Sequence, residues 1–127
     1  KKKKNINYIK IKIMLLHKYK TNEAIENLYN SSNILASKYN IHNNKLAIIF
    51  KGGRQYLYHD VKKSDYDIFE NAESQGKVLN THIKNYKVEK IEGTVDITPI
   101  LEQIEQLKKT IDFIRLLSIY NKNTYEN

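Results

Sequence analysis

Acidic and histidine side chains are the residues of this sequence that could hold a metal ion or transfer protons. Five carboxylates fall between residues 60 and 73, and four histidines are spread along the chain: Asp60, Asp65, Asp67, Glu70, Glu73, His17, His42, His59 and His82. The histidines lack the short spacings typical of metal ligands. Acids at a helix start or on its solvated face explain the carboxylates better, so we expect no metal site and no cofactor.

The nucleophilic residues give no stronger pattern. Ser74 and His82 could belong to a hydrolase triad, but Ser74 lacks the full glycine-flanked pattern of a nucleophile elbow. Gly52 and Gly53 lack the Walker pattern of a phosphate-binding loop. The chain has no cysteine, which excludes disulfides, thiolate zinc sites and cysteine nucleophiles. We therefore expect a protein that is not an enzyme, has no catalytic residue and takes no small-molecule substrate.

Two alternating tyrosines, Tyr56 and Tyr58, stand next to Arg54. In a strand, both rings point to the same face. Exposed aromatic rings on a sheet can stack on unpaired bases, so this face is a candidate for binding single-stranded nucleic acid. The alternative is that both rings pack in the core against Tyr66 and Phe69. Exposure to solvent distinguishes the two interpretations.

Basic residues would supply the phosphate contacts of such a surface. The chain has 22 Lys and Arg against 14 Asp and Glu, a formal net charge of +8, which favours polyanionic partners. An AT-rich genome, which favours Lys, Ile and Asn, is an alternative source of the lysines. The candidate contacts are an N-terminal basic arm and four lysines of the central segment: Lys1, Lys2, Lys3, Lys4, Lys62, Lys63, Lys77 and Lys84.

The hydrophobic pattern predicts no association with membranes. No apolar run approaches the roughly 18 residues of a membrane span, and the stretch from Ile9 to Leu16 lacks the features of a secretory signal. We expect a cytoplasmic protein, or one inside a virion if a phage encodes it. Because the chain begins with Lys1 and not Met, we also expect a processed product or part of a longer protein.

The elements that position these residues can be predicted from periodicity and turn chemistry. Alternation from Asn5 to Met14 predicts a strand, and Thr21 is a plausible N-cap for a helix over 22–30. The period of that helix could continue as far as Tyr39. Asn40 to Asn44 has the composition of a turn.

The pattern of the central segment predicts strands followed by short helices. We expect strands over 45–50, 55–61 and 88–91, with a tight turn at Gly52-Gly53 between the first two. A short helix over 65–73 should be capped by Ser64. A break over 74–77 precedes a second helical pattern that ends at Tyr86, with Ser74 as its cap and Gly76 supplying a backbone turn.

The C-terminal region predicts a long helix. Thr98 and Pro99 form a strong helix start, and the helix should run to about Tyr120. Five aliphatic residues follow the 4-3-4-3 spacing of a coiled-coil seam: Ile100, Ile104, Leu107, Ile111 and Ile114. We expect this seam to bind a protein partner, either a second copy or another chain. The alternative is packing against the N-terminal segment of the same chain.

The central segment resembles the KTSC domain, a small module found alone in bacterial and phage proteins and at the C-terminus of some lysyl-tRNA synthetases. The residues that carry the resemblance span about 32–86 and include Ser32-Asn33-Ile34, Tyr39, Gly53-Arg54, Tyr56-Leu57-Tyr58, Tyr66, Phe69, Gly76-Lys77 and Tyr86. Lys38 and Val78-Leu79 depart from the family pattern. The resemblance implies that residues 32–40 form a strand and do not continue the preceding helix. It also implies the suggested role of the family, RNA binding.

These observations predict an α+β fold. We expect an antiparallel meander of three or four strands, two short helices packed on it, an N-terminal strand and short helix, and a long C-terminal helix. Residues 1–31 would form an N-terminal arm, residues 32–93 the KTSC-like module and residues 94–127 a helix for packing or oligomerisation. The expected function is nucleic-acid binding, with a structural subunit of a larger assembly, such as a phage virion, as the alternative.

Overall fold

The structure, a computed structural model, describes residues 14–126, with side chains as far as Lys122. It contains six strands, three short helical segments and one long helix: β1 (Leu15–Lys20), β2 (Ala24–Tyr29), β3 (Ile34–Asn40), β4 (Leu46–Phe50), β5 (Gln55–Tyr58), α2 (Lys63–Glu70), α3 (Gln75–Val78), the π-helical turn η1 (Leu79–Ile83), β6 (Val88–Ile91) and α4 (Thr98–Glu126). The strands form one antiparallel sheet in the order of the chain. The predicted α+β fold is confirmed, with six strands instead of three or four.

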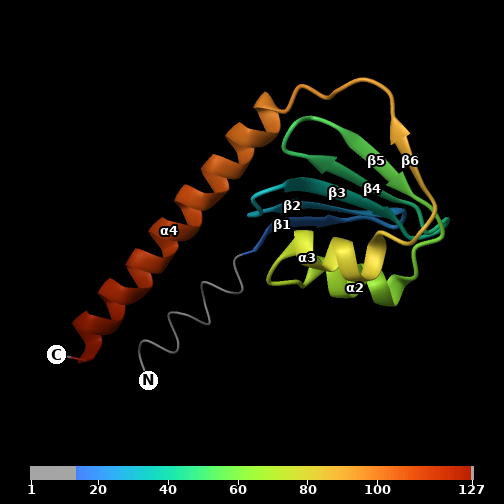
Figure 1. The fold of residues 1–127 in the computed structure, drawn as a ribbon. Coiled ribbons are helices and arrows are strands. Elements are labelled where there is room, and N and C mark those ends of the chain that lie inside the picture. The colour runs from blue at the N-terminus through green and yellow to red at the C-terminus, as the bar shows by residue number, and fades with distance from the viewer. Residues whose placement is uncertain (1–13, 127) are drawn as a thin grey trace.

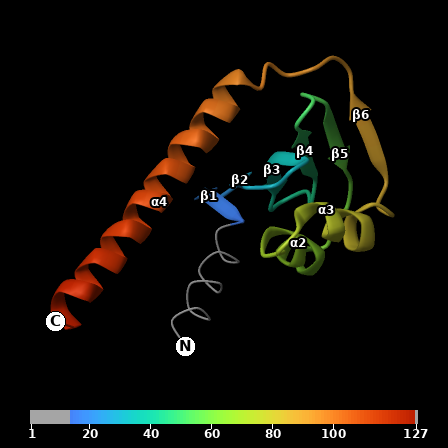
Figure 2. The same cartoon turned by 60° about the vertical axis from the view of Figure 1, so that its left-hand side comes forward.

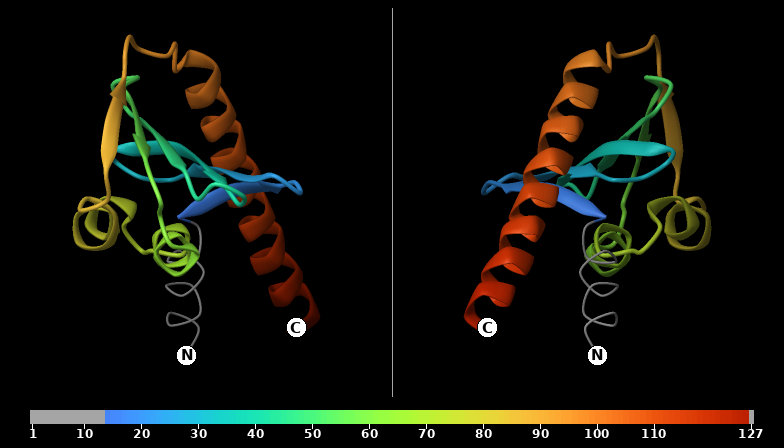
Figure 3. Two further views of the ribbon diagram at one scale, coloured as in Figure 1. Left: turned by 90° about the vertical axis from the view of Figure 1, so that its right-hand side faces the viewer. Right: turned by 90° about the vertical axis from the view of Figure 1, so that its left-hand side faces the viewer.

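The helices occupy both faces of the sheet. α2, α3 and η1 lie together on one face, and α4 crosses the other face before extending past the edge of the sheet (Figures 1 and 2). The strongly twisted sheet therefore forms the middle layer of the described chain, as the end-on views in Figure 3 show. None of the helices within residues 14–126 is long and apolar enough to span a membrane.

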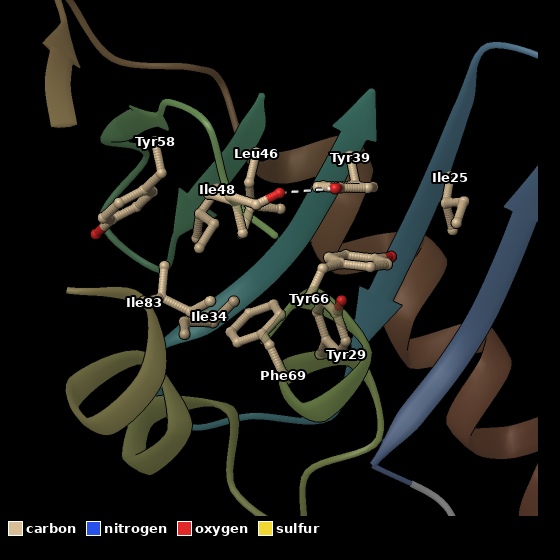
Figure 4. Close-up of a cluster of buried hydrophobic side chains, with 11 residues drawn as sticks. Ile25, Tyr29, Ile34, Tyr39, Leu46, Ile48, Tyr58, Tyr66, Phe69 and Ile83 are labelled. Carbon is tan, nitrogen blue, oxygen red and sulfur yellow. Dashed lines mark hydrogen bonds between the residues drawn. The ribbon is translucent and has the colours of Figure 1, made fainter. Parts of the chain in front are cut away.

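The main core lies between the sheet and α2, and aromatic rings fill much of it. Tyr39 of β3 stacks on Tyr66 of α2 with ring centroids 4.3 Å apart. Tyr29 of β2 meets Phe69 of α2 edge to face at 5.6 Å. The Tyr39 hydroxyl donates a hydrogen bond of 2.7 Å to the backbone oxygen of Val61, so its polar end is satisfied inside the core (Figure 4).

The predicted helix over 22–30 is wrong, because these residues form β2 and the turn before it. Thr21 does cap, but it caps a β-turn: its hydroxyl oxygen accepts hydrogen bonds from the backbone N–H groups of Glu23 and Ala24. Ile25, Asn27 and Tyr29 all face the main core. The polar Asn27 breaks the apolar alternation that would have predicted a strand. The implied strand over 32–40 is confirmed as β3.

The edge strand β1 follows the segment where a strand was predicted. The prediction over 5–14 falls almost entirely outside the described residues, and the observed strand begins at Leu15. A bulge between Leu15 and His17 shifts its register against β2. Leu15 packs on the main core and Leu16 packs on the opposite face of the sheet, as the alternation of side chains along a strand requires.

Both predicted turns between the central strands are confirmed. The Asn40 side-chain oxygen accepts hydrogen bonds from the backbone N–H groups of His42 and Asn43, and Asn44 adopts φ +58°. Gly53 adopts φ +85°, and a Cβ at this position would lie 2.7 Å from the backbone oxygen of Val95. The glycine is therefore required both by its backbone angle and by the chain that passes over the turn.

The helix caps are only partly as predicted. α2 begins at Lys63, and no side-chain hydrogen bond within the described chain caps its start, so the cap predicted at Ser64 is wrong. Ser74 does cap α3, because its hydroxyl oxygen accepts a hydrogen bond from the Lys77 N–H. Gly76 lies inside α3 and is not among the positive-φ glycines, so its predicted role as a turn residue is wrong.

Helix α4 begins where predicted and continues past its predicted end. Its first N–H, that of Thr98, donates a hydrogen bond of 3.0 Å to the Asp96 side chain. The proximal half packs on the sheet through Ile104, which is buried, and through neighbours that are partly buried: Ile100, Leu107 and Ile111. They contact Leu16 and Leu35 of the outer sheet face, which form a second, smaller core.

Candidate functional site

The tyrosine pair of β5 belongs to the main core. Tyr58 is 6% exposed and lies beside Ile48 at one end of the buried cluster (Figure 4). Tyr56 is half-buried and meets Phe50 edge to face at 5.4 Å. Burial raises the pKa of the Tyr58 hydroxyl. Tyr58 is therefore too buried to stack on a base, and the prediction is wrong for this residue. The alternative, packing in the core, describes both tyrosines, because both rings lie on the sheet face that the short helices cover.

The basic residues predicted to contact phosphates are divided between two ends of β5. Arg54 lies in the turn before this strand, whereas Lys62 and Lys63 follow it at the start of α2. The Lys62 N–H donates to the Tyr86 hydroxyl at 3.2 Å, and Lys84 at the end of η1 lies two residues before that tyrosine.

All of these basic side chains are exposed, as is that of Lys77 in α3. Lys63 pairs with Asp67 one helical turn away, which neutralises part of this charge. The predicted arm, Lys1 to Lys4, lies outside the described residues.

One predicted surface carboxylate, Glu70 of α2, is in fact buried. Its Oε1 accepts a hydrogen bond of 2.8 Å from the Lys18 ammonium, and its Oε2 accepts bonds from Asn27 (2.8 Å) and the Tyr66 hydroxyl (2.9 Å). Burial raises the pKa of the Glu70 carboxyl, but these three donors outweigh burial and hold the pKa below its usual value. The ion pair ties the edge strand β1 to α2, so its role is structural.

A groove of about 470 Å³ lies on the outer sheet face, beside the proximal end of α4. Small and aliphatic side chains of the middle strands form its floor, including Ala36 of β3 and Ala47 of β4. Its polar rim includes Tyr19 and His17 of β1, Lys38 of β3 and Gln55 of β5. The volume is in the range of small-ligand sites. Sequence reasoning missed the groove because its residues come from six elements, β1 to β5 and α4, and the small residues Ala36 and Ala47 were its one local signal.

Among residues 14–126, no three acidic or histidine side chains lie close enough together to hold a metal ion. His59 is near a carboxylate, since its Nε2 lies 2.7 Å from Glu89 Oε1 of β6, but this is an isolated pair at the exposed edge strand. The groove and the distal half of α4 are two further surfaces of the described chain that could bind a partner.

The distal half of α4 exposes apolar side chains. Leu116 is 65% exposed, whereas Ile104 in the proximal half is 5% exposed. The exposed apolar residues of this half are Phe113, Ile114, Leu116, Leu117, Ile119 and Tyr120. The prediction that the five-residue seam binds a partner is therefore wrong for four of its residues. These four pack on the sheet of their own chain: Ile100, Ile104, Leu107 and Ile111. Of the five, only Ile114 is exposed.

Four of the exposed residues form a second stripe on the helix, which we call the distal stripe: Phe113, Leu116, Leu117 and Tyr120. Ile104 and Phe113 are nine residues apart, as are Leu107 and Leu116. Nine residues make about two and a half turns of an α-helix, so these pairs lie on opposite sides of α4. The distal stripe therefore faces away from the side that packs on the sheet, and it is not a continuation of the predicted seam.

Comparison with known proteins places the central segment in a family. The family model of the KTSC domain matches residues 30–86. Among solved structures, the chain is similar to the crystal structure of a KTSC domain protein from Yersinia pestis, with 30% sequence identity and a TM-score of 0.50. That similarity covers 52% of this chain and 94% of the other. The chain belongs to the KTSC domain family. A search of curated proteins finds no match.

The KTSC family match covers only part of the molecule. Residues 30–86 include β3, β4, β5, α2, α3 and η1, and therefore the centre of the main core. The elements β1, β2, β6 and α4 lie outside these residues. In this KTSC domain protein, Tyr56 and Tyr58 pack in the main core, while one wall of the groove and the whole distal stripe come from α4, outside the matched residues.

Proposed function

We propose that this KTSC domain protein is a non-enzymatic assembly subunit whose long helix α4 docks on protein through the distal stripe. The observation that carries the proposal is the switch in the outward face of α4. In the proximal half this face is polar, with Glu102 and Gln106, and in the distal half it is apolar, with Phe113 and Leu116. A helix that needed only to cover the sheet would stay polar on this side along its whole length.

The energetics of exposed apolar groups support docking. Fully burying a Leu or Phe side chain is worth about 1.5–3 kcal/mol, and soluble monomers rarely expose large contiguous apolar patches. Aromatic residues are enriched at protein interfaces relative to the rest of the surface. Phe113 and Leu116 are both at least 60% exposed, so their burial against a partner would supply much of this free energy.

The substitution Leu116→Glu tests the proposal. We expect the wild-type protein to migrate above its monomer mass in nuclease-treated native extract, and the Leu116→Glu variant to migrate at the monomer mass, because a charge in the stripe opposes its burial. Gln106→Glu is the matched control, since it adds the same charge on the same outward side of the proximal half. A wild-type protein that migrates at the monomer mass, or an unchanged mass in the Leu116→Glu variant, would contradict the proposal.

A second candidate function is the binding of single-stranded nucleic acid in the groove. The observation that favours it is Tyr19, which is 57% exposed at the rim, where a base-stacking ring must be accessible. Lys38 and His17 line the same groove and could contact a phosphate, and Gln55 could hydrogen-bond to a base edge. The net charge of +8 favours such a partner. This hypothesis keeps the predicted ligand but moves its aromatic contact from β5 to β1.

The test is the affinity for a fluorescent single-stranded RNA. We expect Tyr19→Ala to weaken binding roughly 5- to 150-fold, the equivalent of about 1–3 kcal/mol for one lost stacking contact, while Tyr19→Phe retains it. Affinity should fall steeply with added salt, with a slope that becomes smaller when Lys38, which lines the groove, is changed to Ala. Salt-independent binding, or equal affinity of the Ala and Phe variants, would exclude this candidate.

A further inference from the structure

We infer that the partner of the distal stripe is a second copy of this chain, bound as an antiparallel pair of α4 helices. The inference rests on the proposed docking function and adds the identity and orientation of the partner. It follows from the order of side chains in the stripe, from the charges beside it and from its position on the molecule.

The distal stripe is nearly symmetric about its own midpoint. It reads aromatic, leucine, leucine, aromatic, with Phe113 and Tyr120 at the ends and Leu116 and Leu117 in the middle. A two-fold axis through that midpoint places Phe113 opposite Tyr120 of the second copy and Leu116 opposite Leu117. Closed homodimers use such a self-complementary patch, in which each surface contacts its own equivalent.

The charges near the stripe favour the antiparallel orientation. In a parallel pair, Lys109 would face Lys109 of the second copy and Asp112 would face Asp112, and like charges directly opposed are unfavourable. The two-fold arrangement instead places Asp112 near Asn121 of the other copy and separates the two copies of Lys109 along the helix pair. No two like charges then meet among these positions.

The position of the stripe leaves room for the second helix. Because it lies on the opposite side of α4 from the sheet-packing residues, a helix can approach to the usual 8–10 Å between axes without displacing the outer sheet face. The distal half also runs past the edge of the sheet, as Figure 2 shows. Four side chains bury less than the roughly 800 Å² per partner of a standard interface, so we expect a reversible dimer.

A pair of complementary charges tests both partner and orientation. In the antiparallel pair, position 116 of one copy faces position 117 of the other. We expect Leu116→Glu and Leu117→Lys each to sediment as a monomer alone, and their equimolar mixture to sediment at twice the monomer mass. A parallel pair would not bring these two substitutions together, so a mixture that stays monomeric while the wild type is dimeric overturns the antiparallel arrangement.

Cross-linking gives an independent readout, because the chain has no cysteine of its own. Under oxidised glutathione, the mixture of Phe113→Cys and Tyr120→Cys should form disulfide-linked dimers, and either variant alone should not. A wild type that is monomeric at every concentration, while Leu116→Glu still removes it from a complex with another protein, would overturn the second copy as partner and leave the docking function intact. If Leu116→Glu changes no complex at all, the docking function fails as well.

Discussion

At the scale of single residues, the buried Glu70 connects the edge strand β1 with the part of the chain that matches the KTSC family. It is 4% exposed, and its carboxylate receives a lysine, an amide and a phenol as donors. Such an arrangement is costly to break, because a buried charge or donor then loses its partner. Sequence reasoning placed Glu70 on a solvated helix face, since the three donors come from β1, β2 and α2 and no local pattern relates them.

We predict that Glu70→Gln lowers the free energy of unfolding by about 2 kcal/mol at neutral pH, the size of hydrogen bonds to a charged group. Because the pKa of Glu70 is lowered on folding, its contribution is present above the unfolded carboxyl pKa and is lost as pH falls through the folded value. The difference between variant and wild type should therefore shrink in acid. Urea denaturation at neutral and acidic pH measures it.

Asp67→Asn is the matched control, because Asp67 lies in the same helix and also pairs with a lysine, but at an exposed site. We expect it to change the unfolding free energy by less than about 1 kcal/mol. A Glu70→Gln effect equal to that of the control, or one that grows in acid, would contradict the structural role of the buried pair.

At the scale of elements, α4 has two different apolar sides. The proximal residues are partly or fully buried on β1 and its neighbours, and the distal residues face outward. The 4-3-4-3 spacing identified the apolar side of the proximal half but not what that side contacts, because the spacing is the same for a helix that packs on its own sheet and for one that binds a partner. The contacts with Leu16 and Leu35 of the outer sheet face show that the proximal half packs within the chain.

We predict that Ile104→Ala lowers the free energy of unfolding by about 2–5 kcal/mol, the usual range for a buried Ile. Ile114→Ala should cost less than about 1 kcal/mol, because its side chain is 56% exposed. Both variants should be compared with the wild type by denaturation at the same low protein concentration, so that self-association does not contribute. Equal costs at the two positions would mean that α4 does not dock on the sheet as described.

At the scale of the whole molecule, the net positive charge disfavours the proposed self-association. A formal charge of +8 on each copy repels a second copy, and salt screens that repulsion. The same salt weakens contacts to a nucleic acid by competing at the phosphates. Salt therefore acts with opposite sign on the two proposed activities, and the two can be separated in one series of buffers.

We predict that the thermal midpoint of the wild-type protein rises with protein concentration, because dimer formation stabilises only the folded state. The rise should be larger at higher salt and absent in the Leu116→Glu variant, which calorimetry at several concentrations would show. A concentration-independent midpoint for the wild type would contradict self-association.

The local order of residues determined much of this protein. Neighbours in the chain suffice for the turn over 40–44, the apolar run of β4 and the helix start at Thr98. The spacing of the central segment identified the family. Tertiary structure alone decided that β2 is a strand, that Tyr58 is buried and that α4 turns one apolar side to the sheet and the other away. Each of these depends on burial against segments distant in the chain, and burial is a property of the packed molecule that no short window of sequence contains.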